Sequence, residues 1–209
     1  MQFLWNQRQE VYRLGMEHLW LVGTAMLFAI AIGVPVGIFL TRRPGWKNVV
    51  LGANSVIQTV PSLALFGLLL PLPWLGAIAD RLAIFALTLY ALLPIIQNTY
   101  VGITGVDAPV REAAIAMGLT NRQLLWQVEL PLASNVIVAG IRVATVATVG
   151  LATIAAAIGA GGLGEFIFRG LAMVDNRVIL AGAIPAAGMA LAAYLLLGLL
   201  QRVLVRVRH

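Results

Sequence analysis

Few residues of this chain are of the types that carry out chemistry. The sequence contains no cysteine, which excludes disulfides, thiolate metal sites and a cysteine nucleophile. Its two histidines, His18 and His209, lie at opposite ends of the sequence, so a histidine metal site is not expected. The long apolar stretches also lack the paired carboxylates, or the serine and histidine pair, that an intramembrane enzyme would need. We therefore predict that the chain itself catalyses no reaction and holds no cofactor.

Two patterns that look like nucleotide-binding motifs occur in the wrong context. Gly159, Gly161 and Gly164 fit the G-x-G-x-x-G spacing of a dinucleotide site. That spacing has meaning only between a strand and a helix, and here it closes a long apolar stretch. The only lysine, Lys47, lies in the segment RRPGWKN, which lacks the frame of a phosphate-binding loop. ATP is therefore expected to be bound by another subunit.

The glycine cluster has two roles open to it. Gly159, Gly161, Gly162 and Gly164 could break a helix and let backbones approach closely at the outer mouth of a pathway, as part of a gate. The simpler alternative is that they only end a membrane span.

The composition indicates which solvent surrounds the chain. Of its 209 residues, 61% are hydrophobic and only 11% are charged, and no water-soluble core of this length could bury that share. Twenty-one glycines and nine prolines fit membrane helices better than soluble ones. The formal net charge of +6 comes from basic residues in short segments between apolar runs, so nucleic acid is not an expected partner.

Apolar runs long enough to cross a hydrocarbon core of about 30 Å occur five times along the chain. Arg142 is the only charged residue within them, and Pro61, Pro71 and Pro94 are expected to kink the helices that contain them. The first run is too long, and begins too late, to be a cleaved signal peptide. We predict an all-α integral membrane protein with an extracytoplasmic N-terminal segment (1–18), a transmembrane domain (19–200, with spans at about 19–40, 49–72, 82–104, 132–158 and 178–200) and a cytoplasmic basic tail (201–209).

The distribution of arginine and lysine predicts the orientation. Taken together, the segments after the first, third and fifth runs carry eight basic residues against three acidic ones, whereas the remaining connecting segments are balanced. We therefore expect the N-terminus outside and the C-terminus in the cytoplasm of a bacterial cytoplasmic membrane. This orientation places residues 105–131 in the cytoplasm, and that segment is long for a loop between adjacent spans.

The segment 105–131 is predicted to form two short helices joined by a glycine. Asp107 can cap the first helix, and Gly118 is placed to end it in a left-handed conformation. Thr120 and Gln123 form a capping-box pair that opens the second helix, and Leu130-Pro131 is expected to break the chain before the fourth span. The first helix carries an apolar stripe, formed by Val110, Ala113, Ala114 and Met117. Such short helices need surfaces to pack on, which could be the protein's own spans and a partner protein. The alternative is an ordinary amphipathic loop that lies on the membrane.

The sequence of this segment, REAAIAMGLTNRQLLWQVELP, resembles the EAA loop of ATP-binding-cassette (ABC) import permeases. The resemblance rests on Glu112-Ala113-Ala114, on Gly118 and on Leu130-Pro131. It implies that the two short helices are coupling helices that seat in a groove of a separate ATPase subunit. The residues expected to couple this chain to the ATPase are Glu112, Ala113, Ala114, Gly118, Leu130 and Pro131.

Three further segments, 58–73, 92–114 and 139–170, resemble the permeases of osmoprotectant importers for glycine betaine, choline or carnitine. The resemblance implies a type I ABC importer (MetI-like) permease fold, with a second permease subunit, ATPase subunits and an external solute-binding protein as partners. A permease for methionine or another amino acid is the alternative within this class. An autonomous secondary transporter or channel is the alternative from another class, although the spans show neither a carboxylate nor convincing inverted repeats.

Neutral polar residues in the second and third runs are candidates for lining a pathway. Gln58, Thr59 and Asn98 are predicted there, with hydrogen bonding between helices as the alternative role, and Pro61 is predicted to lie in the pathway or gate beside them. Arg142 lies about eleven residues, or roughly 16 Å of helix, beyond Pro131. It could line the pathway, pair with Glu129 or extend to the lipid headgroups, and the sequence leaves all three open.

Overall fold

The computed structural model describes residues 7–206, with side chains up to Val203. Predictions on residues 1–6 and 207–209, including the end of the basic tail and His209, lie outside the described residues. The described part of the chain is helical and contains no strand, as predicted. Its elements are α2 (Arg8–Arg42), η1 (Pro44–Trp46), α3 (Lys47–Thr59), α4 (Ser62–Leu69), α5 (Ala79–Thr104), α6 (Ala108–Ala116), α7 (Asn121–Gln123), η2 (Leu124–Glu129), α8 (Leu130–Ala155), η3 (Ala156–Ile158), α9 (Gly164–Met173) and α10 (Asn176–Arg206).

Four helical stretches of the described chain are long and apolar enough to cross a membrane, and a bent helix pair makes a fifth if it counts as one span. This agrees with the prediction of about five spans. The first helix is longer than its apolar run, because α2 begins at Arg8 and includes most of the segment predicted to precede the span. The four stretches are Arg8–Arg42, Ala79–Thr104, Asn121–Ile158 and Asn176–Val203, and the bent pair is Pro44–Thr59 with Ser62–Leu69.

The second apolar run is broken rather than kinked. α3 and α4 meet at an angle of 100°, with Val60 and Pro61 in extended conformations between them. Proline disfavours helical geometry in the residue before it and has no N–H to donate, so the helix ends at Thr59. The hydroxyl of Tyr90 on α5 donates a hydrogen bond to the carbonyl of Val60, which keeps the broken backbone satisfied.

Small residues set the spacing of the bundle. α5 packs between α2 and α8, and a Cβ at Gly37 or Gly140 would lie 2.5 Å from side-chain atoms of α5. Glycine therefore lets these helices approach more closely than any other residue would. The core along them consists largely of alanine and leucine, as at Ala25, Ala86 and Ala152.

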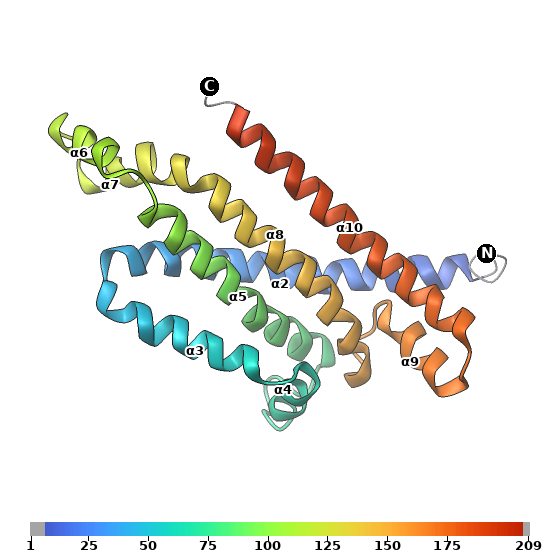
Figure 1. Ribbon diagram of the computed structural model, residues 1–209. Coiled ribbons are helices and arrows are strands. Elements are labelled where there is room, and N and C mark those ends of the chain that lie inside the picture. The colour runs from blue at the N-terminus through green and yellow to red at the C-terminus, as the bar shows by residue number, and fades with distance from the viewer. Residues whose placement is uncertain (1–6, 207–209) are drawn as a thin grey trace.

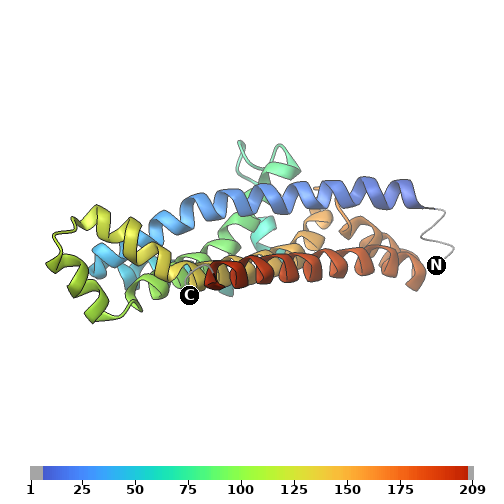
Figure 2. The same ribbon diagram turned by 90° about the horizontal axis from the view of Figure 1, so that it is seen from above.

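The remaining helices occupy different sides of the bundle (Figure 1). α3 and α4 lie on one side of α5, while α10 runs along α8 and contacts α9. Only 6% of the most apolar stretch of α10 is buried, so most of its surface is left uncovered by this chain. α6 and α7 project at one end of the bundle, and α9 lies at the opposite end, near the start of α2 (Figures 1 and 2).

Candidate functional site

The α6–α7 hairpin, formed by α6, the turn at 117–120 and α7, lies at one end of the bundle. Gly118 adopts φ +85° and ends α6, as predicted, with its N–H donating to the carbonyl of Ile115 at 2.9 Å. Thr120 and Gln123 form the predicted capping box, in which each side chain bonds the backbone N–H of the other. Asp107 occupies the N-cap position of α6, but its side chain makes no capping hydrogen bond.

The chain does not break after α7, and the prediction of a break at Leu130-Pro131 is wrong. Residues 124–129 form a π-helix that continues directly into α8, with the N–H of Leu130 donating to the carbonyl of Leu125. Pro131 falls in the first turn of α8. A proline destabilises a helix least at this position, because a residue of the first turn need not donate a backbone hydrogen bond. The preceding π turns, whose hydrogen bonds span one more residue than those of an α-helix, carry the chain into α8 without a break. Leu130 packs against the buried cluster of Ile103, Ala133 and Ile137, so it lies beneath the hairpin rather than on its exposed face.

A buried carboxylate fixes the hairpin to the bundle. Glu129, on the last turn of the π-helix, is fully buried and forms an ion pair with Arg42 at the end of α2. Arg111 of α6 places its Nε 3.2 Å from Glu129 Oε1 and donates through Nη2 to the carbonyl of Ile103 at 2.9 Å. The cluster of Arg42, Arg111 and Glu129 therefore joins α2, α6 and the start of α8.

This role of Glu129 is not predicted from the sequence, where the residue is only a candidate partner for Arg142. That pairing is wrong, since both charges that contact Glu129 come from other helices. The available signal was the position of arginines at the ends of the first and third apolar runs. The sequence alone could not pair these arginines with Glu129, because it does not show that the π-helix turns this carboxylate into the bundle.

Large apolar side chains are exposed on the hairpin and on the π-helix that follows it. Val110, Ile115, Met117 and Trp126 are 43%, 54%, 74% and 63% exposed. Glu112, Ala113 and Gly118 also lie in exposed positions. The predicted stripe does not form one face, because Ala114 is 2% exposed and points towards the chain itself. A short helix with two apolar sides can pack on its own bundle and on another surface at once. The hairpin thus has the properties of a docking site.

Of the predicted pathway residues, Gln58 has a clear structural partner. Pro94 has no N–H, so the carbonyl of Tyr90, four residues earlier in α5, loses its helical hydrogen bond. Gln58 Nε2 donates to that carbonyl at 2.9 Å, which joins α3 to α5. Gln58 also lines a cavity of about 350 Å³ between α3, α5 and α8, together with Gln97.

The other predicted pathway residues of the second and third runs do not line that cavity. Thr59 donates to the carbonyl of Val56 in its own helix at 2.7 Å, and Pro61 lies at the exposed break after α3. Asn98 donates to the carbonyl of Pro94 at 2.8 Å and packs closely against Gly140 of α8. Their role in a pathway stays a prediction.

The glycine cluster breaks the chain between α8 and α9. Gly159, Gly161 and Gly162 have φ of +80°, +75° and +81°, a region that favours glycine. The N–H of Gly162 donates to Glu17 Oε2 at 3.2 Å, so the loop is held against α2. A Cβ at Gly164 would lie only 1.9 Å from the carbonyl oxygen of Thr153. The predicted close approach of backbones is present, and the role as a gate stays a prediction.

The same end of the molecule is tied together by charges. Arg169 of α9 donates to Glu10 of α2 at 2.8 Å and lies 3.9 Å from Glu165. The hydrogen bond from Arg169 to Glu10 raises the pKa of the arginine above its usual value, so it remains charged at any physiological pH.

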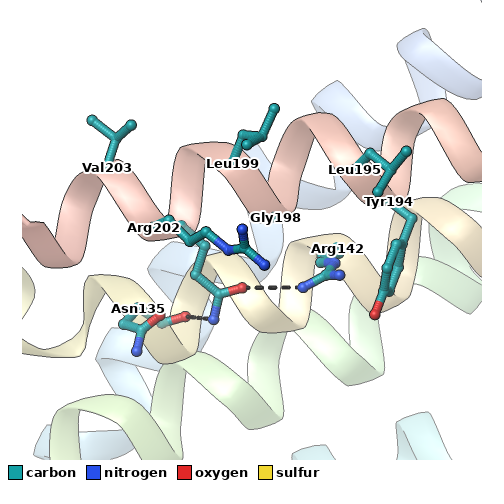
Figure 3. A pocket seen from close by; sticks show the side chains of 9 residues that line it. Asn135, Arg142, Tyr194, Leu195, Gly198, Leu199, Arg202 and Val203 are labelled. Carbon is teal, nitrogen blue, oxygen red and sulfur yellow. Dashed lines mark hydrogen bonds between the residues drawn. The ribbon is translucent and has the colours of Figure 1, made fainter.

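Arg142 lies between α8 and α10. Its guanidinium stacks on the ring of Tyr194, with Cζ 3.4 Å from the ring centre, and Nη1 donates to Gln201 Oε1 at 3.4 Å (Figure 3). It is therefore level with the end of the uncharged part of α10. The predicted pathway residues Arg142 and Gln58 line two different cavities, and Asn98 lines neither of these two.

Comparisons with known proteins agree with this architecture. Residues 33–208 match the family described as "Binding-protein-dependent transport system inner membrane component". A carnitine transport permease protein of Listeria monocytogenes is 46% identical over 88% of this chain and 84% of its own length. A choline transport system permease protein of Bacillus subtilis is 44% identical over 92% of this chain and 84% of its own length. A solved structure of a methionine ABC transporter in an inward-facing conformation superposes with a TM-score of 0.82 at 21% identity, covering 98% of both chains.

Proposed function

The chain belongs to the inner membrane components of binding-protein-dependent transport systems, the permease subunits of ABC importers, and we propose that it imports a quaternary-ammonium osmoprotectant such as glycine betaine, carnitine or choline. The relatives named for carnitine and choline support this substrate class, as does an osmoprotectant import permease protein of Salmonella typhimurium, 43% identical over 90% of this chain and 88% of its own length. The methionine transporter supports the fold alone, because its identity is only 21%.

The α6–α7 hairpin carries the proposal for how transport is driven. An ATPase subunit would dock on the exposed residues Val110, Ile115, Met117 and Trp126, which have no cover in the described chain. The buried Glu129 cluster makes the hairpin rigid with respect to α2 and α8, because a buried charge separated from its partners is strongly unfavourable. Movement of the docked subunit would then tilt the membrane helices instead of bending the hairpin alone.

The remaining assignments follow from this docking. ATP is bound and hydrolysed by the partner, so the hairpin faces the cytoplasm, with the N-terminus outside and the C-terminus inside. The loop 159–164 and α9 then face outwards, where an external solute-binding protein would deliver the solute. No carboxylate lies in the five apolar runs, so we expect that protein, rather than this chain, to capture the cation tightly. A second permease, either another copy or a relative, would complete the pathway.

Co-purification followed by reconstitution tests the proposal. The wild-type chain should retain the ATPase and support ATP-dependent uptake of glycine betaine into vesicles. A variant with Glu112→Lys and Gly118→Leu places a reversed charge and a strained residue on the exposed hairpin, and it should lose both properties while remaining folded.

Asp80→Lys is the matched control, because it reverses a charge at an exposed position at the far end of α5. It should retain the ATPase and its uptake. Uptake that proceeds without ATP or the ATPase would instead identify an autonomous carrier, and uptake of methionine in place of betaine would overturn the substrate assignment.

A further inference from the structure

A large cavity lies between α8 and α10, and no residue of the α6–α7 hairpin lines it. It has a volume of about 900 Å³ and contains two arginines, Arg142 on α8 and Arg202 on α10 (Figure 3). No carboxylate of the described chain lines it. The lining residues are Asn135, Arg142, Tyr194, Leu195, Gly198, Leu199, Gln201, Arg202 and Val203.

The hydrogen-bonding groups of Arg142 are incompletely used. Among the described residues its guanidinium donates to Gln201 alone, across a long contact of 3.4 Å. Its Nε is buried and has no hydrogen-bond partner in the described chain. Gln201 is itself held in place, because its Nε2 donates to the carbonyl of Asn135 at 3.3 Å. A buried donor without a partner is costly, so an acceptor from outside the chain would lower the free energy of this site.

Tyr194 and Gly198 hold the guanidinium of Arg142 in a position where it can bind an anion. Tyr194 covers one face of it, and Gly198 leaves room for it against α10. A Cβ at Gly198 would lie 3.2 Å from Arg142 Cζ, so a larger side chain there would displace the guanidinium. The planar fork of arginine suits an oxyanion such as phosphate, which can accept two parallel hydrogen bonds.

The position of the cavity along the membrane normal identifies the source of the anion. The uncharged part of α10 ends at Leu200, and Arg142 lies level with Gly198 and Gln201. Beside the cavity, Leu195, Leu199 and Val203 are 52%, 56% and 57% exposed, at the spacing of one helix face. An apolar stripe that ends in cations matches a lipid, whose acyl chain lies beside its charged headgroup.

We propose that the α8–α10 cavity binds the headgroup phosphate of an anionic phospholipid, with Arg142 and Arg202 as its donors and the acyl chain along Leu195 and Leu199. The bound lipid would supply the acceptor that Arg142 lacks and would fill the uncovered side of α10. This site is separate from the docking hairpin, and it does not depend on which solute is transported.

Native mass spectrometry of the purified full-length chain tests the site, with phosphatidylglycerol, phosphatidylcholine and inorganic phosphate offered separately. We expect phosphatidylglycerol to bind most tightly and Arg142→Ala to weaken it about tenfold, as the loss of a charge-assisted pair of hydrogen bonds implies. Arg142→Lys should retain part of the affinity, since it keeps the charge and loses the fork. Gly198→Leu keeps Arg142 but obstructs its position, so it should also weaken binding.

Arg43→Ala is the matched control, because it removes an equally charged, exposed residue that does not line the cavity. It should bind phosphatidylglycerol as the wild type does. The proposal is overturned if Arg142→Ala and Gly198→Leu also bind as the wild type, if Arg43→Ala loses as much affinity, or if phosphatidylcholine binds equally well.

Two competition arms distinguish the other sources of an anion. A large excess of inorganic phosphate, or of glycine betaine with its carboxylate, should leave phosphatidylglycerol bound. Displacement by either would assign the cavity to that small anion and overturn the lipid proposal. Dissociation of a permease pair on Arg142→Ala, with lipid binding unchanged, would assign it to a subunit contact instead.

Discussion

Glu112 on α6 and Glu129 on the π-helix after α7 lie in the same segment of the chain but have different structural roles. Glu129 is fully buried between two arginines of other helices, whereas Glu112 is exposed on α6. Removing a buried carboxylate leaves Arg42 and Arg111 facing each other without neutralisation, while removing an exposed one changes only the surface.

This difference predicts distinct effects of two conservative variants. Glu129→Gln should lower the stability of the chain by about 3 kcal/mol, because it breaks a buried ion-pair cluster. It should also weaken ATPase binding, since the hairpin is no longer fixed. Glu112→Gln should leave the thermal unfolding temperature unchanged and reduce ATPase binding alone. Differential scanning fluorimetry in detergent, together with co-purification, measures both. Equal unfolding temperatures for the two variants would contradict the assigned role of Glu129.

Gln58 offers a second test at the scale of single residues. Because it donates to the carbonyl that Pro94 leaves free, Gln58→Leu should destabilise the chain by about 1–3 kcal/mol. Pro94→Ala restores an N–H for that carbonyl, so the cost of Gln58→Leu should largely vanish in the double variant. Thermal unfolding of all four proteins of the cycle measures the coupling. If Gln58→Leu costs the same in both backgrounds, its hydrogen bond to Tyr90 contributes nothing, and a pathway role for Gln58 gains weight.

At the scale of elements, close approach of helices depends on a few glycines. Gly140 of α8 lies against α5, where a Cβ would be 2.5 Å from Asn98 Cβ and 2.7 Å from the carbonyl oxygen of Pro94. Gly150, in the same helix, has no neighbour within 4 Å of such a Cβ. The backbone contact at Gly140 cannot yield without moving one helix away from the other.

The two glycines therefore form a matched pair of variants. Gly140→Ala should lower the thermal unfolding temperature and reduce uptake, since α5 and α8 must separate. Gly150→Ala should leave stability unchanged or raise it by up to about 1 kcal/mol, because alanine favours helices. Circular dichroism melting in detergent measures both. A loss of stability at Gly150 as large as at Gly140 would show that helix packing does not explain the effect.

Some of these elements can be predicted from the sequence and others cannot. Apolar length predicts the long helices, and Gly118, Thr120 and Gln123 predict the ends of α6 and α7, because these signals are local. The helix ends after α3, whereas the sequence predicts only a kink there. A proline kinks some helices and ends others, depending on which neighbouring groups replace the backbone hydrogen bonds that it removes. The π-helix before Pro131 is not predicted for the same reason. The Glu129 cluster joins residues 87 positions apart, so only the packed bundle reveals it.

At the scale of the whole molecule, the two ends of the bundle differ in the structures and side chains that they carry. One end carries the apolar hairpin, and the other carries α9, the glycine loop and the ion pair between Arg169 and Glu10. The proposed orientation assigns the first end to the cytoplasm and the second to the outside.

The absence of cysteine makes this orientation directly testable. Met117 on the hairpin and Val174 after α9 are 74% and 89% exposed, so either can be replaced by a single cysteine. In intact cells a membrane-impermeant maleimide should label Val174→Cys and leave Met117→Cys unlabelled until the membrane is opened. The reverse pattern would place the N-terminus in the cytoplasm and would remove the ATPase from the hairpin.

The ion-pair cluster of Arg42, Arg111 and Glu129 also constrains how the chain is made. The ribosome synthesises Arg42 and Arg111 before Glu129, 87 and 18 residues earlier, so the hairpin can be locked in place only once Glu129 has emerged. Until then Arg42 and Arg111 repel each other, and α6 has no fixed position against the first span. We therefore expect a nascent or truncated chain to offer no stable surface to the ATPase. The cluster would restrict assembly with the ATPase to chains whose synthesis has passed Glu129 and reached the fourth span.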